Sequence, residues 1–218
     1  MRRVAWEWGW GAAFAAFVAY AAFAAPPDDP ALTRALVRGT FTGDFSGVDP
    51  AIAAVFSALG VVPILASTFV LRDGARRVLP AWPFALGMFV VGAFALLPWL
   101  ALRNVGGPRA LPRPPGPVRR LVARRFFGVG IVLALVGLLG WGLARGSAGA
   151  YAHAFRTVSM VHVMSIDLVV CTALLFVLVE EARRLDDVAR AEPAAAQALR
   201  FLPLLGTALW NALTPRTP

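Results

Sequence analysis

The sequence predicts an all-α protein: a polytopic transmembrane helical bundle of five to six spans, forming a single integral membrane domain over residues 1–218. Two observations predict this fold. Of the 218 residues, 59% are hydrophobic and 15% are charged, which differs from the usual balance of a soluble domain. The apolar residues also gather in runs of about 20, the helical length that crosses a hydrocarbon core about 30 Å thick. The lipid bilayer is therefore the first expected partner.

The expected spans follow one another along the chain. Five are apolar runs at 8–25, 51–71, 81–102, 126–144 and 158–179. Several Trp residues lie near the ends of these runs, where amphipathic rings favour the membrane interface. The sixth segment, 194–213, contains Arg200 and Pro203, and we expect it to span, to re-enter or to lie in the interface.

Small residues and prolines within the runs predict how the helices pack. The glycines of 126–144 and the alanines of 8–25 should let helix backbones approach closely. Pro63, Pro98 and Pro203 lie in apolar runs, where each is expected to kink its helix.

Two connecting segments carry most of the acidic residues. The acidic connection 26–50 is expected to hold one short interfacial helix near 32–37. The mixed-charge stretch 180–192 is expected to be a solvated helical continuation, whose spacing permits Glu181 to pair with Arg184 and Asp186 with Arg190.

The chain has a net charge of +9, and its basic residues lie in loops between apolar runs. Their positions indicate how the protein is oriented in the membrane. This placement argues against nucleic acid as a partner. The loop 103–125 holds seven Arg and no acid, so it is expected on the cytoplasmic side of a bacterial cytoplasmic membrane. Six spans would then place both termini outside. That arrangement conflicts with the positive-inside rule, which expects basic residues on the cytoplasmic side. The conflict arises at five positions: Arg2, Arg3, Arg72, Arg76 and Arg77.

An alternative reading of the N-terminus is a cleavable signal peptide, because two Arg precede an apolar stretch and an Ala-Phe-Ala sequence at 22–24. Its apolar run of 18 residues is long for such a signal. Cleavage would also turn the seven-Arg loop outward. We therefore expect the segment to remain as a span.

Asp167 is the main candidate for a functional residue, since an acid inside a span is costly and needs a partner. Three interpretations are open. Asp167 is protonated or pairs with Arg200 and ties two helices together; it binds a proton or cation with His162 as a relay; or its segment contacts a pigment, a quinone or a protein partner.

The neighbouring polar residues offer weaker sites. His162 precedes Asp167 by five positions, about 140° around a helix, so the two do not share a face. Ser165 lies on the stripe of His162. A second stripe comprises Met160, Met164, Asp167 and Cys171. Its Met and Cys could hold copper(I), but Met is also ordinary packing material and no other span contributes a matching Met or His cluster, so we expect packing.

Cofactor and enzyme motifs are sparse. The two histidines belong to one segment, which disfavours a haem held between them, although His162 remains a single-ligand option for a pigment. The chain contains no phosphate-binding glycine loop, no HExxH and no GxSxG sequence. We therefore expect no enzyme and assign no catalytic residue, metal or cofactor.

Three stretches of the chain carry a resemblance to known proteins: 48–71, 80–102 and the His-Val-Met-Ser-Ile-Asp sequence at 162–167, followed by Glu180 and Glu181. Together they resemble an uncharacterised family of cyanobacterial and chloroplast multi-pass membrane proteins. The resemblance implies a multi-helix protein without an agreed activity, placed in a thylakoid-type membrane if the source is phototrophic. It favours a role beside an energy-converting complex.

Taken together, these features predict a non-enzymatic accessory or assembly partner of a membrane complex, in contact with other membrane-protein subunits. The alternative is a small proton, cation or solute transporter that uses Asp167 and His162.

Overall fold

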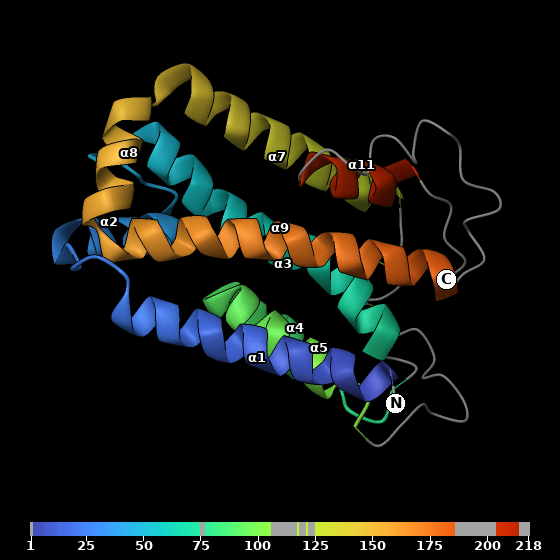
Figure 1. Cartoon of the computed structure of the whole chain (residues 1–218). Coiled ribbons are helices and arrows are strands. Elements are labelled where there is room, and N and C mark those ends of the chain that lie inside the picture. Colours follow the sequence, from blue (N-terminus) through green and yellow to red (C-terminus); the bar gives the residue numbers. More distant parts are fainter. Residues whose placement is uncertain are drawn as a thin grey trace.

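The computed structural model describes residues 2–74, 77–105, 117, 121, 125–185 and 204–213. Within these ranges every regular element is a helix, as the composition predicts, and the longer helices lie side by side in a bundle (Figure 1). Three of them are long and apolar enough to cross a membrane: Pro50–Gly74, Phe126–Arg145 and Ser159–Arg183. The apolar parts of three other helices are shorter, Trp8–Phe23, Trp82–Val91 and Ala93–Leu102.

The helices agree with most of the expected spans. Helix α1 (Arg2–Phe23), α3 (Pro50–Gly74), α7 (Arg125–Arg145) and α9 (Ser159–Leu185) correspond to the first, second, fourth and fifth runs. The expected short helix near 32–37 is α2 (Pro30–Thr42), and α8 (Ala148–Thr157) precedes α9. Of the segment 194–213, residues 205–213 form α11 (Leu205–Leu213), whereas Arg200 and Pro203 lie outside the described residues.

The prediction of one continuous span over 81–102 is wrong. This stretch forms two helices of 10 residues each, α4 (Trp82–Val91) and α5 (Ala93–Leu102), separated at Gly92. The two helices fold back on one another, because the rings of Phe84 and Trp99 lie 5.5 Å apart, centroid to centroid. In one straight helix, 15 residues would separate them by about 22 Å.

Both outer ends of this hairpin lie at the same end of the bundle. A Cβ atom on Gly74, the last residue of α3, would overlap Ala81, which immediately precedes α4. Arg103, which directly follows α5, forms an ion pair with Asp73. Each helix is about 15 Å long, half the thickness of a hydrocarbon core. The hairpin therefore enters the bundle and returns without crossing it.

The bundle has two ends, which we name after an acid at each. The Asp73 end holds the last turn of α3, Arg103 and Glu181 of α9, and the N-terminus lies nearby (Figure 1). At the Asp49 end, the Asp49 carboxylate accepts hydrogen bonds from the backbone N–H groups of Ala51 (2.8 Å) and Ser147 (3.1 Å), which joins the start of α3 to the start of α8. Helices α1, α3, α7 and α9 run between these ends.

Close helix packing uses only some of the glycines of α7. A Cβ atom on Gly142 would overlap Ala54 of α3, and one on Gly128 would lie 2.8 Å from the Cα atom of Ala212 in α11. These positions confirm that small residues let the backbones approach. By contrast, three others have open space beside them: Gly130, Gly137 and Gly140.

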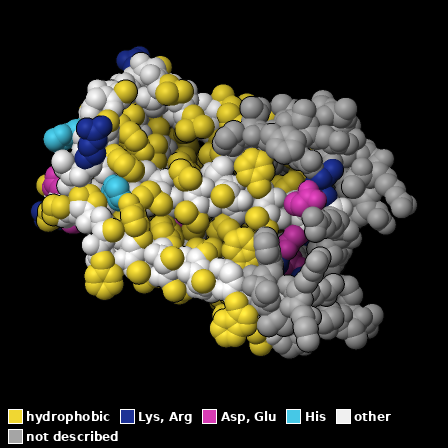
Figure 2. Space-filling model, viewed as in Figure 1, with side chains coloured by type: hydrophobic (Ala, Val, Ile, Leu, Met, Phe, Trp, Pro, Cys, Tyr) yellow, Lys and Arg dark blue, Asp and Glu magenta, His cyan; other side chains and the backbone are white. Residues whose placement is uncertain are grey.

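The outer surface of the bundle is strongly apolar. Large hydrophobic side chains such as Leu133 and Val169 are more than half exposed. Figure 2 shows hydrophobic side chains across the middle of one face, with the described charged side chains near its two ends. This distribution fits a protein whose middle section contacts lipid.

Candidate functional site

Asp167, the main candidate from the sequence, lies in α9 and is buried, with 6% of its surface exposed. Its carboxylate oxygen Oδ1 accepts a hydrogen bond of 2.8 Å from the backbone N–H of Ala93, the first residue of α5. The first N–H groups of a helix have no partner within the helix and carry partial positive charge. Asp167 therefore caps α5 from another helix. The expected partner, Arg200, lies outside the described residues.

Gly92 makes this contact sterically feasible. Its backbone dihedrals, φ 52° and ψ −124°, are strained for any residue with a side chain. A Cβ atom at this position would overlap the Asp167 carboxylate. The break in the hairpin and the position of the buried acid thus depend on one another.

His162 and Ser165 take part in a different group of contacts, at the Asp49 end. Nδ1 of His162 lies 2.7 Å from the carbonyl oxygen of Phe155, so this nitrogen must carry a proton and donate it. The Tyr20 hydroxyl lies 2.6 Å from Nε2 of the same ring and donates to it when the ring is neutral. Both ring nitrogens are hydrogen-bonded, so a pigment bound at His162 would have to displace Tyr20.

Ser165 is buried between α8 and α9. Its hydroxyl donates to the Val161 carbonyl at 2.5 Å and accepts from the Tyr151 hydroxyl at 2.6 Å. The structure thus uses Ser165 to attach α8 to α9. His162 and Ser165 have separate sets of partners from Asp167, which agrees with the angular separation of His162 and Asp167 on the helix.

The stripe that suggested copper is used for packing. Met164 lies in the apolar cluster of the Asp49 end, while Cys171 lies in the main core. Among the described residues, no group of three or more His, Cys, Asp or Glu side chains is placed to hold a metal ion.

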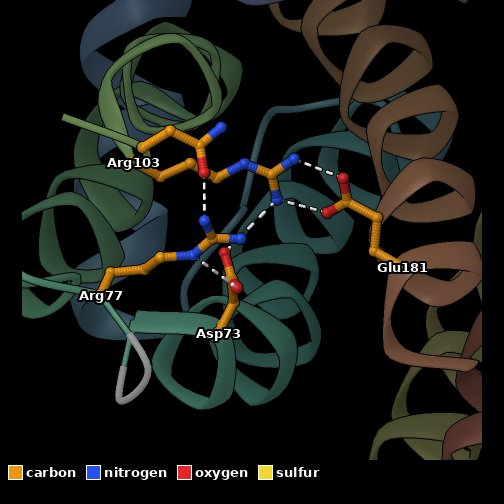
Figure 3. Close-up of polar contacts among 5 residues, drawn as sticks. Asp73, Arg77, Arg103 and Glu181 are labelled. Carbon is orange, nitrogen blue, oxygen red and sulfur yellow. Dashed lines mark hydrogen bonds and ion pairs between the residues drawn. The ribbon is translucent and has the colours of Figure 1, made fainter. Parts of the chain in front are cut away.

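A second buried site, the Arg103 network, was not predicted from the sequence. Its members join α3, α5 and α9 at the Asp73 end, as Figure 3 shows for Asp73, Arg77, Arg103 and Glu181. Arg103, 3% exposed, pairs through two nitrogens with the Glu181 carboxylate and at 3.4 Å with Asp73. Arg77 pairs with the other Asp73 oxygen at 3.1 Å.

The charges of this network balance one another. Burial lowers the pKa of Arg103, but the hydrogen bonds and charges of Glu181 and Asp73 outweigh that effect and raise it above its ordinary value. The guanidinium therefore stays charged. Glu181, expected in a solvated continuation with Arg184, pairs with the buried Arg103, and its side chain is 30% exposed. The side chain of Arg184 lies outside the described residues.

Sequence signals for the missed residues were weak. Asp73 and Arg103 follow the ends of two predicted spans, which is also where charges lie in any membrane protein. Gly92 is one of several glycines in apolar runs. Only the folding back of 81–102 brings Asp73 and Arg103 together.

The comparisons with known proteins add no relative: no family model, no curated protein and no solved structure matches the chain. The similarity to the cyanobacterial and chloroplast membrane proteins stays a prediction.

Proposed function

We propose that the chain is a non-enzymatic accessory or assembly subunit of a membrane complex in the bacterial cytoplasmic membrane, with four membrane crossings and one re-entrant hairpin. The crossings are α1, α3, α7 and α9, and the hairpin is α4 with α5. One observation carries the proposal: the buried charged groups of the described residues join helices to one another. Asp167 holds α5, while Arg103 links α5 to α3 and α9.

The hairpin also supports one orientation of the chain in the membrane. Because the hairpin returns to the Asp73 end, the segments around Arg2, Arg72 and Arg103 all belong to that end. Of the arginines in the described residues, eight belong to this end: Arg2, Arg3, Arg72, Arg77, Arg103, Arg125, Arg183 and Arg184. The other four, Arg34, Arg38, Arg145 and Arg156, belong to the Asp49 end. The positive-inside rule then makes the Asp73 end cytoplasmic, together with both termini.

Labelling of single cysteines tests this topology. In a Cys171→Ala background, Val78→Cys and Val105→Cys flank the hairpin at partly exposed positions. A membrane-impermeant maleimide should reach neither site in intact cells and both sites in inverted vesicles. Asp44→Cys, on the opposite side, is the control with the reverse pattern. Labelling of positions 78 and 105 from opposite sides would mean that 81–102 crosses the membrane.

The accessory role is tested by purification of the tagged chain from its native membrane in a mild detergent. We expect a particle heavier than the 23.2 kDa chain with its detergent, containing another membrane protein in a fixed ratio. A monodisperse single chain without a second subunit would contradict the proposal.

Proton or cation transport is the second candidate, and the hairpin is the observation that favours it. Some transporters place helix ends and an acid together inside the membrane, as Asp167 and the start of α5 do here. Along α9, however, Asp167 is about 21 Å from Glu181, and the main apolar core lies in between. Proton or cation flux into liposomes that contain the purified protein tests this candidate. Flux that is present in the wild type and lost in Asp167→Asn would support transport over the accessory role.

A further inference from the structure

The tip of the hairpin contains backbone carbonyl groups that accept no hydrogen bond from the described residues. In an uninterrupted helix, the carbonyls of Phe89, Val90 and Val91 would accept from the N–H groups of residues 93, 94 and 95. Here the N–H of Ala93 donates to Asp167, and that of Ala95 donates to the Gly92 carbonyl. Among the described residues, nothing donates to the three carbonyls of residues 89–91.

This part of the hairpin also faces outward. Val90 is 84% exposed, and Phe89 and Val91 are about half exposed. They continue an exposed stripe that begins with Trp82 and Leu86 on the same helix. We call these five residues the α4 face.

Lipid is a poor neighbour for such a tip. Hydrocarbon offers no donor, and irregular backbone at membrane depth is tolerated only where protein or a water-filled cavity covers it. The carbonyls at the end of α4 also carry the partial negative charge of the helix dipole. The α4 face therefore needs a neighbour that is apolar along most of its length and brings a donor to the depth of residues 89–91.

We propose that the α4 face is the docking site for a transmembrane helix of another membrane protein, and that this helix carries a hydrogen-bond donor side chain at the depth of the hairpin tip. Amide, hydroxyl and cationic side chains meet this requirement. The proposal rests on the proposed function, because it names the surface through which an accessory subunit contacts its complex.

A second copy of the chain fits this face less well. Two copies with the same orientation are related by an axis along the membrane normal, so each residue would meet residues of its own depth. The side chains that the α4 face presents near the tip, Phe89, Val90 and Val91, have no donor. The indole N–H of Trp82 starts eight residues away, about 12 Å below the tip. A matching pair of α4 faces would leave the carbonyls unsatisfied.

Photocrosslinking in the native membrane tests the docking site. The photoreactive residue p-benzoylphenylalanine is placed at position 90 and, as the matched control, at position 133 on α7, where Leu133 is 66% exposed. We expect position 90 alone to give an adduct with a second protein. The crosslinked peptide should lie within a transmembrane segment beside a donor side chain, and replacement of that donor by Leu should reduce the adduct at least tenfold.

The other outcomes separate the two proposals. An adduct of twice 23.2 kDa would show that a second copy covers the face and would overturn the inference. If the complex purifies intact but position 90 reacts only with lipid, or the donor replacement has no effect, the docking site is wrong and the accessory role stands. If no complex is found and position 90 reacts only with lipid, both fail.

Discussion

Replacement of Gly92 by Ala should strongly destabilise the hairpin, because the added methyl group meets both an unfavourable backbone conformation and the Asp167 carboxylate. The backbone at φ 52° and ψ −124° costs a residue with a Cβ atom about 1–3 kcal/mol. The added methyl also overlaps the Asp167 carboxylate and must displace it from the Ala93 N–H, a bond to a charged group worth about 1.5–3 kcal/mol. We expect a total loss of about 3–5 kcal/mol in the free energy of unfolding.

Reversible unfolding of the purified protein in mixed micelles, followed by circular dichroism, measures this loss. Gly137→Ala is the matched control, because nothing lies within 4 Å of a Cβ atom at that position of α7. Alanine there should be neutral or stabilise the helix by up to about 1 kcal/mol. If the free energies of unfolding of Gly92→Ala and Gly137→Ala differ by less than about 1 kcal/mol, the proposed cause of the helix break at Gly92 is refuted.

A double variant identifies the cause. In Gly92→Ala the hydrogen bond from Ala93 is already lost, so Asp167→Ala should add little further destabilisation. We expect the two effects to fall short of additivity by about 1.5–3 kcal/mol. Full additivity would mean that the strain at Gly92 and the Asp167 contact are independent.

Three further predictions concern the polar contacts, each measured by the same unfolding assay. Asp167→Ala should cost about 2–3 kcal/mol and Asp167→Asn less, since an amide oxygen can still accept from α5; equal losses would argue against a capping role. Arg103→Met should cost about 3–5 kcal/mol because it leaves buried carboxylates unpaired. Its cost should fall in a Glu181→Gln background, and an unchanged cost would show that the two side chains are not coupled. Tyr20→Phe should cost about 1 kcal/mol through the lost bond to His162, and an unaltered midpoint would contradict that contact.

The hairpin changes the significance of the arginines. With 81–102 as a full span, Arg72, Arg76 and Arg77 fall opposite the seven-Arg loop, against the positive-inside rule. With the chain folded back at Gly92, Arg72, Arg77 and Arg103, the first residue of that loop, belong to one end. The buried Arg103 network depends on the same reversal, since it requires the end of α5 to meet the end of α3.

The sequence by itself determined the apolar helices and most of their positions. A run of about 20 apolar residues favours a helix in lipid whatever its neighbours are, because each backbone group is satisfied within the helix. For this reason α1, α3, α7 and α9 lie where the hydropathy predicts them. The sequence also identified Asp167 as a buried acid that needs a partner.

Only the tertiary structure decided the path of 81–102 and the partners of the charges. A straight span and a folded hairpin have the same hydropathy, so composition cannot distinguish them. The choice depends on a contact between Ala93 and Asp167, which are 74 residues apart, and on a glycine that leaves room for it. Among the described residues, the partner of Asp167 is a backbone N–H that becomes free only when the helix breaks, and a search among charged side chains could not find it.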